Sequence, residues 1–137
     1  MVDQAEFLRW RAEADAGLEV ARESRRGERH NWTCFLAEQA AQLAVKALLH
    51  GLGTGPWGHD LVMLGRALSD AVAHPLPEPL QNTLARLSKL YIPTRYPDAH
   101  PEGSPGDHYT AEEADQALDD AAMVIATIDD LWQQLVA

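Results

Sequence analysis

Apolar residues recur at intervals of three and four along five stretches of this chain, the spacing that gathers them on one face of an α-helix. We expect a first helix from about residue 4 into the low twenties, where Ser24 to Glu28 ends it. A second should run from about residue 30 to 50 and stop at the glycines that follow. A third should begin at Asp60, a suitable N-cap, and stop before Pro75.

Two further helices complete the pattern. A short one is expected between residues 77 and 91, and a long one from the capping box Thr110 and Glu113 to about Leu135. No stretch alternates apolar and polar residues over a strand's length, so the pattern predicts an all-α fold, an up-and-down bundle of four or five helices in one domain, 1–137. In the second helix the expected apolar line is Trp32, Phe35, Leu36, Leu43, Ala47 and Leu48.

Between the last two helices lies a polar, proline-rich segment, residues 91–110. Long loops inside a compact domain are usually functional or disordered. This one holds all three tyrosines of the chain, together with Arg95, His100 and His108, so we expect any chemistry here.

Composition narrows the possible functions. The formal net charge is −10, which disfavours broad binding of RNA or DNA, because such binding needs a positive face. The arginines at positions 22, 25, 26 and 29 are best explained by the end of the first helix, where cations suit the helix dipole. With one cysteine, no signal-peptide pattern and no long apolar run, the sequence predicts a reduced, cytoplasmic protein without a membrane span.

Four elements in order resemble the HEPN domain family over about residues 5–136. They are Ala37-Glu38-Gln39-Ala40-Ala41-Gln42-Leu43-Ala44-Val45-Lys46-Ala47-Leu48-Leu49, then His59-Asp60-Leu61, then Thr94-Arg95-Tyr96-Pro97-Asp98, then Tyr109-Thr110-Ala111-Glu112-Glu113-Ala114. The resemblance implies a homodimeric helical bundle, often paired with a minimal nucleotidyltransferase as toxin and antitoxin. Some branches are metal-independent ribonucleases that carry an Arg and a His separated by four to six residues.

Two segments fit that ribonuclease spacing, Arg95 to His100 and Arg25 to His30. Chance alone gives about one such match in a chain of this composition, so the spacing decides nothing. At the first segment the Arg is followed by Tyr96 and Pro97, where the ribonuclease branches have a polar residue.

Two functions therefore remain open. One is a binding module, without cofactor, that takes a nucleotide or a nucleotidyltransferase partner through Tyr91, Arg95, Tyr96, Asp98 and Tyr109. In this interpretation Arg95 pairs with a carboxylate and Tyr96 packs on the bundle. The alternative is an endoribonuclease in which Arg95 holds the phosphate and His100 from each protomer supplies acid and base across a dimer cleft.

Other side chains receive simpler expectations. Asp98, His100, Asp107 and His108 have metal-ligand chemistry, but their spacing matches no closed site, so we expect a solvated loop. We expect Glu38 and Lys46 on the surface, Cys34 as small apolar filling, and His59 in local helix capping. Trp57 is either a contact for a partner or a residue that pins its turn to the bundle.

Overall fold

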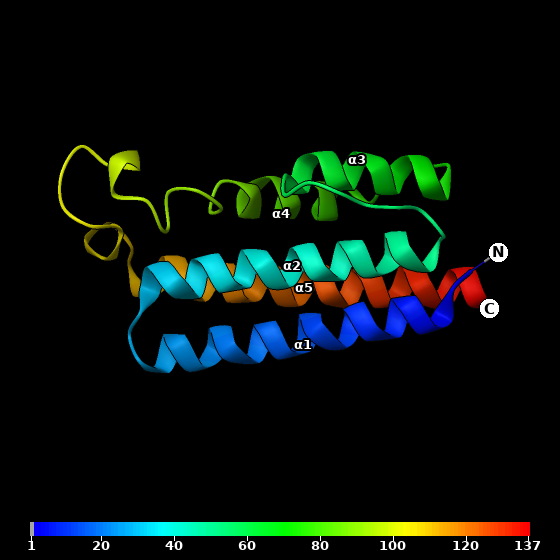
Figure 1. Ribbon diagram of the computed structural model, residues 1–137, viewed down its shortest axis with the longest axis horizontal. Coiled ribbons are helices and arrows are strands. Elements are labelled where there is room, and N and C mark those ends of the chain that lie inside the picture. The colour runs from blue at the N-terminus through cyan, green and yellow to red at the C-terminus, as the bar shows by residue number, and fades with distance from the viewer. Residues whose placement is uncertain (1) are drawn as a thin grey trace.

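Three long helices form the body of the molecule in the computed structural model, which describes residues 2–137. They are α1 (Gln4–Arg26), α2 (His30–Gly51) and α5 (Ala111–Val136). Two shorter helices, α3 (Leu61–Val72) and α4 (Glu78–Ser88), form a second layer over them (Figure 1). No strand occurs within the described residues, so the all-α prediction is confirmed.

The helix boundaries follow the expected signals. Asp3 and Asp60 accept backbone N–H groups as N-caps of α1 and α3. Thr110 and Glu113 form the predicted capping box at α5. At α1 the helix continues to Arg26, a few residues beyond the expected end, and Glu28 then takes a positive φ in the turn to α2.

The centre of the bundle is built from the small residues of α2. Ala37, Ala40, Ala41, Ala44 and Ala47 are all fully buried, and α2 packs mainly on α1 and α5. A methyl group placed on Gly17 of α1 would lie 3.6 Å from the Ala40 side chain, so the two helices approach closely there.

Four large apolar residues of α2 do not share that buried face. Trp32 is 47% exposed, and Phe35, Leu36 and Leu43 are only half-buried. The expected apolar line was therefore wrong for these four residues and right for Ala47 and Leu48, which are buried. The closely packed face of α2 is occupied by its alanines together with Leu48 and Leu49, so these four side chains lie outside it.

Three ion pairs with two hydrogen bonds each tie α5 to its neighbours. Arg11 and Arg25 of α1 bind Asp129 and Asp115, and Arg86 of α4 binds Asp120, with the shortest contact of each pair between 2.7 and 2.9 Å. At the end of the bundle that carries both chain termini, the Phe7 and Trp132 rings stack with centroids 4.2 Å apart. The opposite end carries residues 91–110 (Figure 1).

Candidate functional site

The segment 91–110 is folded onto the bundle. It contains two short 3₁₀ helices, η1 (Pro97–Ala99) and η2 (Pro105–His108). Thr94 is fully buried, and its carbonyl accepts a hydrogen bond of 3.0 Å from the side-chain amide of Asn31 on α2. This contact fixes the backbone directly before Arg95.

Arg95 lies against three aromatic rings. Its guanidinium carbon is 4.1 Å from the ring centroid of Phe35, 4.8 Å from that of Tyr91 and 4.9 Å from that of Tyr96. Its Nε and Nη2 donate to the Tyr91 carbonyl at 3.2 and 2.8 Å. The expected carboxylate partner was wrong, because the stack and this carbonyl hold the guanidinium in its place. Tyr96 covers the guanidinium but is itself 46% exposed.

Below this stack lies a buried carboxylate. Glu38 of α2 is fully buried, so the expected surface position was wrong for it, whereas Lys46 is half-buried. The side-chain amides of Gln39 and Gln42 donate to its two oxygens at 2.8 and 2.6 Å. Burial raises the pKa of Glu38 to about 7, while the two amides and the positive charge of Arg95 act in the opposite direction.

Gln42 connects the carboxylate to the aromatic stack. Its amide nitrogen also donates to the His59 carbonyl at 3.0 Å, and its amide oxygen lies 3.3 Å from His59 Nδ1. The His59 ring stacks on Tyr91 with centroids 5.3 Å apart. The expectation of local capping was wrong for His59, since Asp60 caps α3 and the imidazole reaches the Tyr91 ring.

His100 belongs to a second stack. Its ring lies parallel to that of His108 with centroids 4.2 Å apart, and Tyr109 lies edge-on to it at 6.1 Å. His100 Nε2 is 2.6 Å from the Pro93 carbonyl, and His108 Nε2 is 2.7 Å from the Glu102 carbonyl. Because a carbonyl only accepts, each Nε2 carries a hydrogen, and Nδ1 is the acceptor of the ring in its neutral form.

The remaining candidates occupy different environments. Asp98 is exposed on η1. Burial raises the pKa of Tyr109, which is half-buried. Arg95 and His100 bind different carbonyls and stack on different rings, so neither is positioned by the other.

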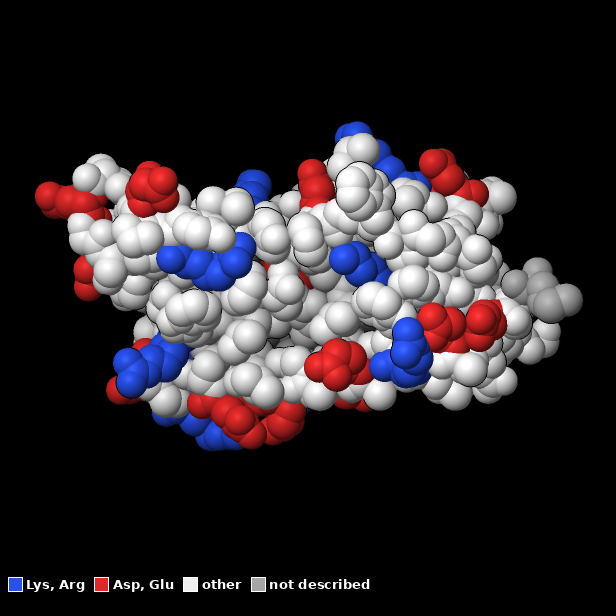
Figure 2. Space-filling model, viewed as in Figure 1, with Lys and Arg blue, Asp and Glu red and all other residues white. Residues whose placement is uncertain are grey.

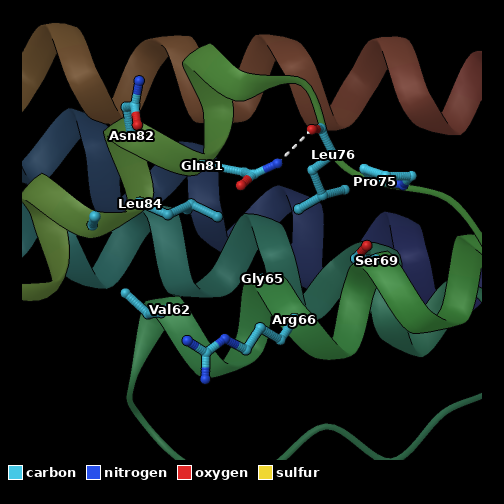
Figure 3. Close-up of a pocket in the computed structure, with 10 residues that line it drawn as sticks. Val62, Gly65, Arg66, Ser69, Pro75, Leu76, Gln81, Asn82 and Leu84 are labelled. Carbon is cyan, nitrogen blue, oxygen red and sulfur yellow. Dashed lines mark hydrogen bonds between the residues drawn. The ribbon is translucent and has the colours of Figure 1, made fainter.

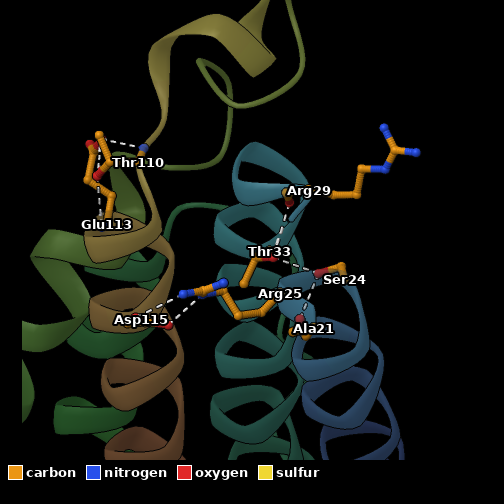
Figure 4. Close-up of polar contacts among 8 residues, drawn as sticks. All are labelled: Ala21, Ser24, Arg25, Arg29, Thr33, Thr110, Glu113 and Asp115. Atoms are coloured by element: carbon orange, nitrogen blue, oxygen red, sulfur yellow. Dashed lines mark hydrogen bonds and ion pairs between the residues drawn. The ribbon is translucent and has the colours of Figure 1, made fainter. Parts of the chain in front are cut away.

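The second Arg-to-His spacing has a structural explanation. Arg25 pairs with Asp115 of α5, and the Ser24 and Thr33 hydroxyls, 2.7 Å apart, join α1 to α2 beside it (Figure 4). Arg29 extends away from these contacts into solvent. Arg25 is thus committed to holding the bundle together.

Comparison with known proteins identifies the family. The HEPN domain model matches residues 7–131. The chain belongs to the HEPN domain family. A crystal structure of TT1696 from Thermus thermophilus superposes with a TM-score of 0.85 at 40% identity, covering 90% of this chain and 96% of that one.

Two further HEPN structures align over nearly the whole domain. An archaeal HEPN homologue, ST0689, gives a TM-score of 0.73 at 31% identity, covering 91% of this chain and 96% of that one. A HEPN domain protein of Thermotoga maritima, tm0613, gives 0.73 at 30% identity, covering 91% and 98%. A search of curated proteins finds no match. No helix within residues 2–137 is both long and apolar enough to cross a membrane.

The sequence of this HEPN domain did not lead us to predict that Glu38 and Gln42 belong to the candidate site. The signal was present in the helical spacing, since positions 38 and 42 lie one turn apart and share a face with Val45 and Leu49, both buried. Polar side chains on a buried helical face need hydrogen-bond partners, and here the Gln42 amide donates to the Glu38 carboxylate.

Glu38 makes the stability of the domain depend on pH. Its folded pKa is raised, so its contribution is fully present below the ordinary glutamate pKa and is lost as the pH rises through about 7. From pH 5 to pH 8, we expect the unfolding free energy of the wild type to fall relative to that of Glu38→Gln by about 2–3 kcal/mol. Urea unfolding at both pH values measures this, with exposed Glu23→Gln as the control. If the difference in unfolding free energy between the wild type and Glu38→Gln is the same at both pH values, the Glu38 carboxyl would be exposed to solvent.

Proposed function

We propose that this HEPN domain is a binding module that works with a minimal nucleotidyltransferase in a toxin–antitoxin-like pair and holds a nucleotide at residues 91–110. The observation that carries the proposal is the Arg95 stack, which sets a cation among aromatic rings beside solvent. A nucleotide offers the two matching groups, a flat base and a phosphate.

The geometry of Arg95 suits a phosphate. Nε and Nη2 are used by the Tyr91 carbonyl, which leaves the two N–H groups of Nη1 without a partner in the described chain. A phosphate could accept from this edge without displacing the guanidinium. The exposed ring of Tyr96 offers surface for the base, while Tyr91, already packed on His59 and Arg95, supports the guanidinium. Asp98 and Tyr109 supply polar groups further along the same segment.

Charge favours a protein partner over a long nucleic acid. The chain carries 21 acidic against 11 basic residues, so extended RNA would be repelled except close to Arg95. A nucleotidyltransferase with a basic surface would instead be attracted over a distance.

An outward stripe on α2 supports the proposed homodimer. Trp32, Leu36 and Leu43 follow one another at helical spacing and are exposed or half-buried. Trp10 of α1 borders the same face, with its buried indole N–H left without a partner in the described residues. Figure 2 shows a hollow among uncharged atoms in the middle of the view, with basic groups above it and acidic groups below it.

A charge on the stripe should break the dimer. We expect Leu36→Glu to shift the protein from dimer to monomer, because it would bury a carboxylate against an apolar partner surface. Light scattering after size exclusion measures the mass. Leu8→Glu, at another exposed apolar position, is the control and should remain dimeric. A wild type that is monomeric, or a Leu36→Glu variant that remains dimeric, would rule out this face.

Nucleotide binding should depend on Arg95. We expect Arg95→Gln to weaken ATP binding about tenfold or more, because a charge-assisted bond to phosphate is lost. Fluorescence titration with a labelled ATP measures the affinity, and Arg9→Gln, near the opposite end of the bundle, removes an equal charge as the control. Equal affinity in the two variants would place the nucleotide elsewhere.

The alternative function is a metal-independent endoribonuclease across the dimer cleft. It is favoured by the contact between His100 and the Pro93 carbonyl, which leaves Nδ1 free as a base that could deprotonate a ribose 2′-hydroxyl. Arg95 would hold the phosphate, and the His100 of the second protomer would protonate the leaving oxygen.

An RNA cleavage assay separates the two functions. If the nuclease function holds, the purified dimer should cut RNA in the presence of a chelator, and His100→Ala should reduce the rate at least a hundredfold. His74→Ala, which removes an exposed imidazole distant from segment 91–110, is the control. Intact RNA in the wild-type reaction, together with ATP binding that requires Arg95, would leave the binding module as the function.

A further inference from the structure

A pocket between α3 and α4 lies apart from segment 91–110. Its volume is about 480 Å³, which falls inside the roughly 300–1,000 Å³ range of small-molecule sites. Figure 3 shows Leu76 and Leu84 directed toward the α3 backbone at Gly65, with Arg66 on the α3 side. Leu76, Leu84 and Gly65 are buried, so the floor of the pocket is apolar.

Arg66 places an unneutralised cation at this pocket. Most arginines of this acidic chain pair with Asp or Glu, but Arg66 has no carboxylate at ion-pair distance among the described residues. Its recorded contact is with the sulfur of Met63, at 3.5 Å. Asp70 lies one helical turn further along α3 and forms no ion pair with it.

The other polar groups of the pocket are only partly used. Gln81 donates its amide nitrogen to the Leu76 carbonyl at 2.7 Å, which leaves its amide oxygen as an acceptor. Ser69 donates to the His74 carbonyl at 3.0 Å and keeps its oxygen lone pairs. The guanidinium is therefore the one charged donor on the pocket wall.

We propose that the α3–α4 pocket binds a small carboxylate that carries an apolar body, such as a medium-chain fatty acid. The guanidinium matches a carboxylate with two parallel hydrogen bonds, and the leucine floor takes the hydrocarbon. A single positive charge in a chain of net charge −10 suits a monoanion and disfavours a phosphate dianion. This site does not depend on the nucleotide site proposed above.

Octanoate is the probe for this site. A titration followed by two-dimensional amide NMR should show saturable shifts at Gly65, Ser69 and Ala85. Butanoate should bind more weakly, by up to about fourfold for each methylene no longer buried. Octylamine, which carries the opposite charge, should not bind.

Matched variants locate the carboxylate and the chain. Arg66→Gln should weaken octanoate binding about tenfold or more, whereas Arg29→Gln should leave it unchanged. Ala85→Leu fills the pocket and should abolish binding, whereas Ala67→Leu, on the part of α3 that faces another hollow, should not. Absence of saturation, shifts confined to other surfaces, or full affinity in Arg66→Gln would overturn the proposal.

Discussion

The close approach of α2 to α1 and α5 determines the character of the rest of the molecule. Alanines occupy much of this contact, and at Gly17 and Ala40 they let α1 and α2 approach closely. The alanines take the closely packed face of α2, and three of its bulky residues, Trp32, Leu36 and Leu43, lie outside that face and remain accessible. A helix buried on most of its surface also carries Glu38 and Gln42 inward, beneath the turn that holds Arg95.

Burial of Glu38 links this packing to the candidate site. A carboxylate out of water needs hydrogen-bond donors, and Gln39 and Gln42 supply them. Gln42 then holds His59, and His59 stacks on the Tyr91 ring, over which Arg95 lies. The position of an accessible guanidinium thus depends on a chain of contacts that begins in the core.

Much of the fold could be predicted from the sequence. Helix boundaries rest on local chemistry, as with the Thr110 and Glu113 capping box, and this information lies within a few residues. The segment 91–110 could be singled out for the same reason. Which face of α2 is buried could not be predicted from apolar spacing, because Trp32 and Leu36 are as apolar as core residues and only the close packing of three helices excludes them.

The partners of Arg95 were equally out of reach. The Arg95 stack joins Phe35 of α2 to tyrosines more than fifty positions later, and His59 comes from the linker between α2 and α3. Such contacts depend on where the linker and the turn cross α2. The family resemblance could supply the helix order, but not these side-chain contacts.

We expect Glu38 and Arg95 to act as one electrostatic unit, because the positive charge of Arg95 lowers the pKa of Glu38. A double-mutant cycle tests it, with labelled-ATP affinity measured for the wild type, Glu38→Gln, Arg95→Gln and the double variant at pH 8 and pH 5.5. At pH 8, loss of the Glu38 charge should strengthen binding only when Arg95 is present, with a coupling of about 1 kcal/mol. At pH 5.5, where Glu38 holds its proton, the coupling should vanish. If Glu38→Gln changes the ATP affinity equally with and without Arg95 at pH 8, the two side chains are not coupled.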